Sequence, residues 1–168
     1  LTGAFQAASK CVFDQSDSAL EFAEMGTTMV AAVVDNGKVY VAHVGDSRAY
    51  LMQKEILNPL TTDHSYVMEL VKLGTITKEE AAVHPKRNII TRAVGIKDTV
   101  ETDMTIVPVE KGDLLLLCTD GLSGMLSDEE MAQMLRQKES VKRKAEKLVE
   151  TANLRGGYDN ISLILIEI

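Results

Sequence analysis

The sequence offers little that could hold a fold together covalently or carry it into a membrane. Only two of the 168 residues are cysteines, Cys11 and Cys118, and they lie far apart in the chain. Cys118 ends an apolar run over residues 114–117, so we expect a buried thiol in a reducing compartment, which favours the cytoplasm. No apolar run approaches the roughly 20 residues that cross a bilayer, and no signal peptide opens the chain, so no membrane partner is expected.

Positive charge is also scarce. The chain has 18 lysines and arginines against 25 acidic residues, which gives a formal net charge of -7. Residues 138–147 are locally basic, but their charges fall on the outer face of a predicted helix, which favours a solvated surface over a binding patch. These features argue against a nucleic-acid partner, because such partners are bound through clustered lysine and arginine.

Length and composition allow one domain, which we assign to residues 1–168. Hydrophobic residues make up 45% of the chain and charged residues 26%, as is ordinary for a globular protein with a real core. The first residue is Leu1 in place of Met, and it falls inside an amphipathic pattern. We therefore expect the chain to be a fragment or a processed form of a longer protein.

Apolar spacing and breaker residues predict a mixture of strands and helices. Strands are predicted over residues 28–34, 38–44, 48–52, 102–108, 113–118 and 161–168. Helices are predicted over residues 1–13, 19–25, 65–73, 77–84, 127–136 and 141–152. Residues 61–92 form a small helical insert between strands, and long inserts of this kind are often functional. Hairpins and adjacent strands dominate, so we predict an α+β domain with antiparallel sheets.

Turn residues mark how the first strands connect. Asn36-Gly37 between two apolar strands is a strong hairpin signal, because both residues tolerate a positive φ. Gly45-Asp46 interrupts the second of these strands, and Arg48 resumes it.

Two capping boxes and one apolar run define the carboxyl-terminal half. Thr77 with Glu80 and Ser127 with Glu130 have the three-residue spacing with which a hydroxyl and a carboxylate cap the start of a helix. The final strand, residues 161–168, is nearly all apolar, which predicts that both of its faces are covered.

Three aspartates share a position at the ends of predicted strands. Asp46 and Asp120 each follow a strand beside a glycine, and Asp159 precedes the final strand just after a glycine pair. Clustered carboxylates repel one another unless a cation joins them, and oxygen ligands select magnesium or manganese. The alternative is that each aspartate caps its own turn. Spacing alone does not decide whether the three converge.

Other hydrolytic chemistries fit the sequence poorly. A cysteine-based phosphatase needs an arginine six positions after its nucleophile, where Cys118 is followed by Gly124 and Cys11 by Asp17. Residues 121–124 have the wrong spacing for the serine elbow of α/β-hydrolases, and no glycine-rich phosphate loop with lysine is present.

The three histidines lack the spacing of zinc ligands. His43 alternates with Val39 and Val41 on one face of a predicted strand, so we interpret it as a packed residue. Metal-carboxylate hydrolysis and a domain without catalysis are the two interpretations that remain.

Six short motifs occur in an order that resembles the bacterial type 2C (PPM) protein phosphatases. They are Met25-Gly26-Thr27-Thr28, Val44-Gly45-Asp46-Ser47-Arg48, Leu60-Thr61-Thr62-Asp63-His64-Ser65, Asn88-Ile89-Ile90-Thr91-Arg92-Ala93-Val94-Gly95, Thr119-Asp120-Gly121-Leu122 and Asp159-Asn160-Ile161-Ser162. The resemblance implies an αββα sandwich of two antiparallel sheets flanked by helices. It also implies hydrolysis of phosphoserine and phosphothreonine in proteins by water activated between two Mn²⁺ or Mg²⁺ ions. The expected role is to oppose a bacterial serine/threonine kinase.

The resemblance also assigns site residues. Asp120 and Asp159 match the family's core metal ligands, with Gly121 beside them, and Asp46 matches the aspartate that helps hold a third, weaker ion. Residues 61–92 match the flap beside the active site. Three further residues in the motifs become candidates for flap or substrate contacts: His64, Arg48 and Asn160.

One family feature is missing from the chain. The family has an Asp-Gly pair near its amino terminus that bridges both metals, and nothing upstream of Met25 supplies it. We therefore expect the chain alone to be nearly inactive, with sheet edges exposed by missing strands that favour self-association. The alternative from another class is a regulatory or interaction domain that keeps the fold without catalysis.

Overall fold

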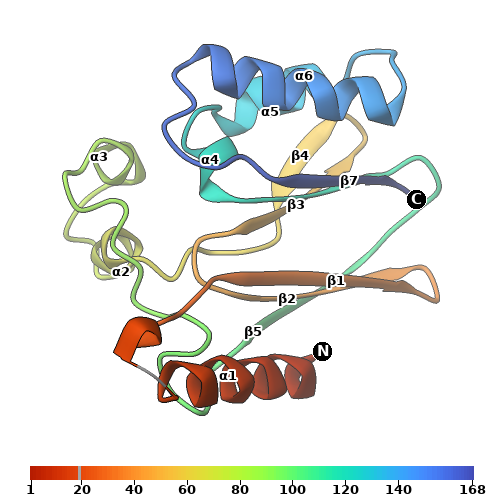
Figure 1. Ribbon diagram of the computed structural model, residues 1–168. Helices are drawn as coiled ribbons and strands as arrows, with labels where there is room; N and C mark the ends of the chain where they lie inside the picture. Colours follow the sequence, from red (N-terminus) through yellow and green to blue (C-terminus); the bar gives the residue numbers. More distant parts are fainter. Residues whose placement is uncertain (19) are drawn as a thin grey trace. The chain divides into compact units, whose positions relative to one another are not determined.

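The computed structural model describes residues 1–18 and 20–168 (Figure 1). The chain divides into two compact units. Unit 1 comprises Leu1–Ala31, Ala42–Asp46 and Thr62–Met104, and unit 2 comprises Ala32–Val41, Ser47–Thr61 and Thr105–Ile168. The described helices are α1 (Thr2–Ser16), the short 3-10 helix η1 (Leu20–Phe22), α2 (Tyr66–Lys72), α3 (Lys78–Ala82), α4 (Asp120–Ser123), α5 (Asp128–Leu135) and α6 (Val141–Leu154). The strands are β1 (Met29–Asp35), β2 (Lys38–Val44), β3 (Arg48–Gln53), β4 (Ile56–Pro59), β5 (Asp103–Pro108), β6 (Leu114–Cys118) and β7 (Leu163–Glu167).

The strands form two antiparallel sheets, with strand orders β1-β2-β5 and β4-β3-β6-β7. Helices accompany both sheets, which confirms the predicted fold class. Asn36 and Gly37 turn β1 into β2 with φ of 48° and 70°, as the hairpin signal predicts. Among the described helices, none combines the length and the apolar character that crossing a bilayer requires.

The core of unit 2 forms around β6, whose five residues are all buried. Tyr50 and Met52 from β3 and alternate residues of β6 form one core cluster with residues of α4, α5 and α6. These helices lie on one side of the sheet that contains β3 and β7 (Figure 1). The helices contribute Leu122, Leu126, Met131, Ala132, Leu135, Leu148 and Ala152 to this core. Burying a leucine-sized side chain stabilises a fold by about 1.5–3 kcal/mol, so this cluster is the main stabilising element of the unit.

The core of unit 1 joins α1 to β2 and to the segment after the helical insert. Phe5 packs with Val44, Val94 and Val100, and all four are buried. Ser9 adds polar links to the same segment, because its hydroxyl accepts a hydrogen bond from the Gly95 amide (3.1 Å) and donates one to the Lys97 carbonyl (2.9 Å).

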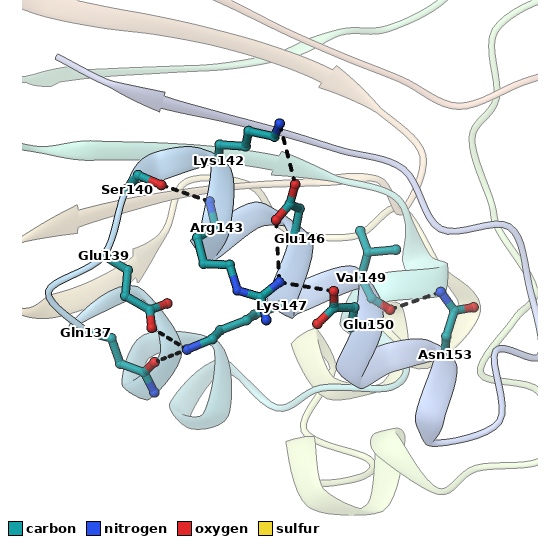
Figure 2. A network of polar contacts seen from close by, with 10 residues as sticks. All are labelled: Gln137, Glu139, Ser140, Lys142, Arg143, Glu146, Lys147, Val149, Glu150 and Asn153. Carbon is teal, nitrogen blue, oxygen red and sulfur yellow. Dashed lines mark hydrogen bonds and ion pairs between the residues drawn. The ribbon is translucent and has the colours of Figure 1, made fainter.

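The outer face of α6 is exposed, and Lys142, Arg143 and Lys147 form ion pairs there, in line with the predicted solvated surface (Figure 2). Lys147 donates to Gln137 (2.9 Å) and Glu139 (2.5 Å), and Arg143 contacts Glu146 (3.4 Å) and Glu150 (3.1 Å). Exposed pairs of this kind contribute little to stability, typically about 0–1 kcal/mol each.

Three predictions about the strands were wrong or incomplete. The strand that Arg48 was expected to resume is a separate strand, because β2 and β3 belong to different sheets. β4 was not predicted at all. The final strand is an edge strand with one covered face: Leu163 and Leu165 pack on the core, while Ile164 and Ile166 are 58% and 40% exposed.

The predicted helix over residues 19–25 also differs from the structure. Ala19 lies outside the described residues, and residues 20–22 form only the single turn η1. Self-association through sheet edges that missing strands would leave exposed stays a prediction, as does the single domain over residues 1–168.

Both capping boxes are confirmed, and the second one is tied to the end of α6. Ser127 and Glu130 cap α5 reciprocally, and both carboxylate oxygens of Glu130 also accept from the Arg155 guanidinium. Arg155 donates further to the Met125 carbonyl (3.1 Å). The Arg155 hydrogen bond and then the bonds from Ser127 lower the pKa of Glu130 to about 2.

We predict that Glu130→Gln lowers the melting temperature at pH 7. The Glu130 pKa is lower in the folded chain than its ordinary value of 4.5, so its ionised form stabilises the fold above about pH 4.5, and this contribution is lost as the pH falls toward 2. The difference between the variant and the unmodified chain should therefore shrink between pH 5 and pH 2.5 or so. Circular dichroism melts measure it, with Glu167→Gln as the control. A difference independent of pH would contradict the assignment.

Candidate functional site

The candidate site in unit 2 lies where β6 ends and the segment before β7 begins. The antiparallel register pairs Cys118 with Leu163, and it continues past the strand ends. The Thr119 amide donates to the Ser162 carbonyl (3.0 Å), and the Thr119 hydroxyl donates to the Asn160 carbonyl (3.2 Å). Asp120, the next residue, is thereby held beside the segment that carries Asp159.

Gly121 allows the two segments to come this close. A Cβ on Gly121 would lie 2.2 Å from the Asn160 carbonyl oxygen and 2.9 Å from its carbon. Both are backbone atoms, so no side chain could be accommodated there without moving the chain. The structure therefore places the Asp120-Gly121 segment against the Asp159-Asn160 segment, a proximity that spacing in the sequence left open.

The two aspartates of this site are exposed and face no cationic side chain. In the part of the chain that the structure describes, no lysine or arginine pairs with Asp120 or Asp159. Asp159 accepts one hydrogen bond from the Asn160 amide (2.7 Å), as a turn aspartate does, and this bond uses only its Oδ1 atom. Two carboxylates on adjacent segments form a donor set that suits a hard divalent cation such as Mg²⁺ or Mn²⁺.

Asp46 belongs to unit 1, where it follows Gly45 at the end of β2. Gly45 has a φ of +102°, and a Cβ there would lie 2.4 Å from the Thr28 methyl group. Only glycine fits this position. The assignment of Asp46 as a third metal ligand stays a prediction.

His64, predicted as a flap or substrate contact, is 4% exposed and holds Gly45 at both backbone polar groups. The Gly45 amide donates to His64 Nδ1 (3.1 Å), and the His64 amide donates to the Gly45 carbonyl (2.9 Å). His64 Nε2 lies 3.3 Å from Asp103 Oδ2 and 3.1 Å from Arg92 Nη1, and Arg92 Nη1 donates to Asp103 Oδ1 (2.7 Å).

These surroundings lower the pKa of both His64 and Asp103, which disfavours the charged form of the histidine and favours the charged form of the aspartate. Burial lowers the pKa of His64, and the Arg92 charge adds to this effect while the Asp103 hydrogen bond opposes it. Partial burial opposes ionisation of Asp103, but hydrogen bonds from Arg92 and His64 outweigh it and lower the Asp103 pKa. His64 is therefore held as a neutral ring and Asp103 as a carboxylate.

The side chains of His43, His64 and Asp103 are close enough to suggest a metal site, since one ligand atom from each lies within 4.8 Å of the others. Their hydrogen bonds argue against it. His64 Nδ1 accepts from Gly45, so Nε2 carries the proton and has no lone pair to offer. The Arg92 guanidinium already stands beside Nε2. His43 is buried and bonded through Nε2 to the Thr62 carbonyl (2.9 Å), in agreement with its interpretation as a packed residue.

Arg48, a second of the three predicted flap or substrate contacts, lies against a buried tyrosine in unit 2. Arg48 Nη1 donates to the Tyr50 hydroxyl (3.1 Å), which donates to Asp128 Oδ1 (3.0 Å). Burial raises the pKa of Tyr50, and so the phenol stays protonated. Sequence reasoning missed this link between β3 and α5, because nothing in the spacing of the three residues connects them.

The comparison with known families decides where the chain belongs. The model for protein phosphatase 2C matches residues 4–160. The chain belongs to the protein phosphatase 2C family.

Relatives of this family are similar to the chain in sequence and in structure. The serine/threonine phosphatase stp of Listeria monocytogenes serotype 4b is 44% identical over 162 residues, which cover 96% of this chain and 64% of the relative. The structure of Stp1 from Staphylococcus aureus has a TM-score of 0.96 at 35% identity and covers 99% of this chain and 66% of that one. The catalytic domain of PstP in complex with two manganese ions has a TM-score of 0.89 at 33% identity, over 99% and 69%.

This chain spans about 64% of the length of its Listeria relative. In unit 2, the motif that contains Asp120 lies beside the motif that contains Asp159. In unit 1, Gly45 of the Asp46 motif is hydrogen-bonded to His64. Sequence reasoning missed Asp103 as a partner of His64. Its only signal was a polar residue at the start of a predicted strand.

We predict that Gly121→Ala destabilises the protein and weakens divalent-metal binding together. The added methyl group collides with the Asn160 backbone, and forced overpacking of this kind costs about 1–3 kcal/mol. The displaced segment carries Asp159, so the two carboxylates should separate. Urea denaturation and Mn²⁺ titration measure the two effects. Gly3→Ala is the control, because nothing lies within 4 Å of its added Cβ. Unchanged metal affinity in Gly121→Ala would contradict the site.

Proposed function

We propose that this chain supplies most of a metal-dependent protein phosphatase domain that hydrolyses phosphoserine and phosphothreonine in proteins. The observation that carries the proposal is the pair Asp120 and Asp159, exposed on adjacent segments with no cationic partner among the described residues. Family membership supports the same reaction, because its relatives are named serine/threonine phosphatases.

The donor set supports Mn²⁺ or Mg²⁺ as the cofactor. Asp120 and Asp159 offer only oxygen atoms, which are the ligands of hard divalent ions, and the PstP neighbour is in complex with two manganese ions. A divalent ion bound there would supply Lewis-acid chemistry, lowering the pKa of a bound water and offsetting the charge of a phosphate. In a protein of net charge -7, such an offset is needed for an anionic substrate to approach.

The chain's own residues would hold and orient the reacting groups. Asp120 is fixed by the first turn of α4, and Asp159 by its bond to the Asn160 amide. Gly121 keeps the two segments in contact. Substrates of this site would be phosphoproteins phosphorylated by a serine/threonine kinase, in the cytoplasm and in a signalling role.

We predict that Asp120→Asn and Asp159→Asn each lower metal affinity and turnover together in the intact phosphatase. Each change removes a charge that balances a divalent ion. The loss of metal affinity should therefore exceed the roughly 10–100-fold loss that follows when a residue bonded to a metal ligand is changed. Asp46→Asn should leave tight metal binding intact while it reduces turnover, since Asp46 would hold only a peripheral ion.

Calorimetric Mn²⁺ titration beside phosphopeptide turnover separates these outcomes, and Asp98→Asn on the exposed surface is the control. Equal loss of tight binding in Asp46→Asn and Asp120→Asn would overturn the ranking of the sites. Full activity in excess chelator would overturn the metal dependence itself.

We also predict that the 168-residue chain alone is nearly inactive on phosphopeptides. The Asp-Gly pair that bridges both metals in the family has no counterpart upstream of Met25. Turnover with Mn²⁺ should rise by orders of magnitude when the chain carries the preceding residues of its native gene, roughly as removal of a metal ligand would lower it. Equal turnover of both forms would contradict this prediction, and inactivity of both would favour a regulatory domain.

A further inference from the structure

We propose that His64 is a positioning residue that fixes the Gly45–Asp46 turn and joins it to the base of the flap insert, residues 61–92. The inference rests on the proposed function only in taking Asp46 as a ligand of a peripheral metal. The hydrogen bonds that carry it are internal to unit 1 and do not depend on any catalytic activity.

His64 holds the residue before Asp46 from two directions. Its ring nitrogen Nδ1 accepts from the Gly45 amide, and its own amide donates to the Gly45 carbonyl, at 3.1 and 2.9 Å. Gly45 therefore has both backbone polar groups bound to one residue. Because Thr28 blocks the other side of Gly45, the direction in which the chain enters Asp46 is fixed. A ligand held in one orientation loses less conformational entropy when it binds an ion.

The ring of His64 is oriented by a second layer of charged groups. With Nδ1 accepting from Gly45, the ring proton lies on Nε2 and points toward Asp103 Oδ2 at 3.3 Å. Arg92 binds the other oxygen of Asp103 at 2.7 Å, so one carboxylate receives both donors. The ring also stacks on His43, with centroids 4.6 Å apart and planes at 15°. These contacts leave one tautomer and one ring orientation.

The same residue closes the base of the flap insert. The Thr91 amide donates to the His64 carbonyl (2.8 Å), and the Tyr66 amide donates to the Ile89 carbonyl (2.8 Å). Ser65 and Ile90 form an antiparallel bridge between these two bonds. The two ends of the insert therefore meet at His64. A displacement of the base of the flap would move the His64 ring and backbone, and with them the Gly45 groups to which they are hydrogen-bonded.

Two substitutions of His64 separate the role of Nδ1 from that of Nε2. Asparagine places its carbonyl oxygen near the position of Nδ1, so His64→Asn keeps an acceptor for the Gly45 amide and loses the contact with Asp103. Glutamine reaches toward the position of Nε2, so His64→Gln keeps the contact with Asp103 and loses the acceptor. His84→Asn and His84→Gln are the matched controls, because the His84 ring accepts from the Lys86 amide and lies 6.3 Å from the Tyr66 ring, with no hydrogen bond to Gly45 among the described residues.

We call the two hydrogen bonds between His64 and Gly45 the clamp. Hydrogen exchange of the Gly45 amide in the ¹⁵N-labelled 168-residue chain measures the strength of the clamp without any assay of activity. We expect His64→Gln to speed exchange roughly 3- to 10-fold, the factor that one hydrogen bond contributes. His64→Asn should retain the protection of the unmodified chain, and both His84 variants should match it. The melting temperature of each variant shows whether a change is local. Equal protection in His64→Asn and His64→Gln would overturn the proposal.

Turnover of phosphopeptide against Mn²⁺ concentration, measured in the intact phosphatase, links the clamp to Asp46. The proposal expects His64→Gln to raise the Mn²⁺ concentration required for half-maximal turnover as Asp46→Asn does, with rescue by His64→Asn. A His64→Gln variant with the unmodified Mn²⁺ requirement would overturn the link. Absence of turnover in every protein, with the exchange pattern as expected, would refute the proposed function and support the clamp.

Discussion

The antiparallel pairing of β6 is the constraint on which the candidate metal site depends. All five residues of β6 are buried, and the strand pairs with β3 on one side and β7 on the other. Because β6 is apolar on both faces, its own pattern does not distinguish one register from the next. Hydrogen bonds beyond the strand ends hold the register with β7, from the Thr119 amide to the Ser162 carbonyl and from the Gly112 amide to the Ile168 carbonyl. With Cys118 opposite Leu163, the next residues along each strand bring Asp120 beside the segment of Asp159.

Local signals were the part of the fold that the sequence could predict. The Asn36-Gly37 hairpin and the two capping boxes depend on side chains and φ angles within a few residues, and all three are present. The order of the motifs also located Asp120 and Asp159 correctly at a strand end and before a strand. Such signals predict the structure well because the local preferences of natural sequences usually agree with the tertiary fold.

Features that depend on distant partners could not be predicted. β4 was missed because the turn before it uses Lys54 and Glu55, with φ of 47° and 67°, in place of the glycine or asparagine that marks such turns. The apolar face of β7 that includes Ile164 gave no sign of being exposed, because hydrophobicity does not reveal which strand lies at a sheet edge. Assignment of β2 and β3 to different sheets likewise needs knowledge of the partners.

The chemical role of the cluster of His43, His64 and Asp103 likewise could not be predicted from the sequence. His43, His64 and Asp103 lie 60 positions apart from first to last along the sequence, and a list of their types suggests a metal site. The direction of the Gly45 hydrogen bond reverses that interpretation, since it leaves His64 Nε2 protonated and facing an ion pair. The proposed metal site is therefore the pair of exposed carboxylates Asp120 and Asp159, which have no lysine or arginine partner among the described residues.

Paramagnetic broadening by Mn²⁺ tests this assignment most directly, because it locates even a weakly bound ion. Mn²⁺ is added in small steps to the ¹⁵N-labelled chain, and the amide signals are followed by NMR. We expect the amides of residues 119–121 and 159–161 to broaden first, before those near Glu146 and Glu150, the two exposed carboxylates of α6. First broadening at His43 and His64, or at Glu146 and Glu150 on α6, would contradict it.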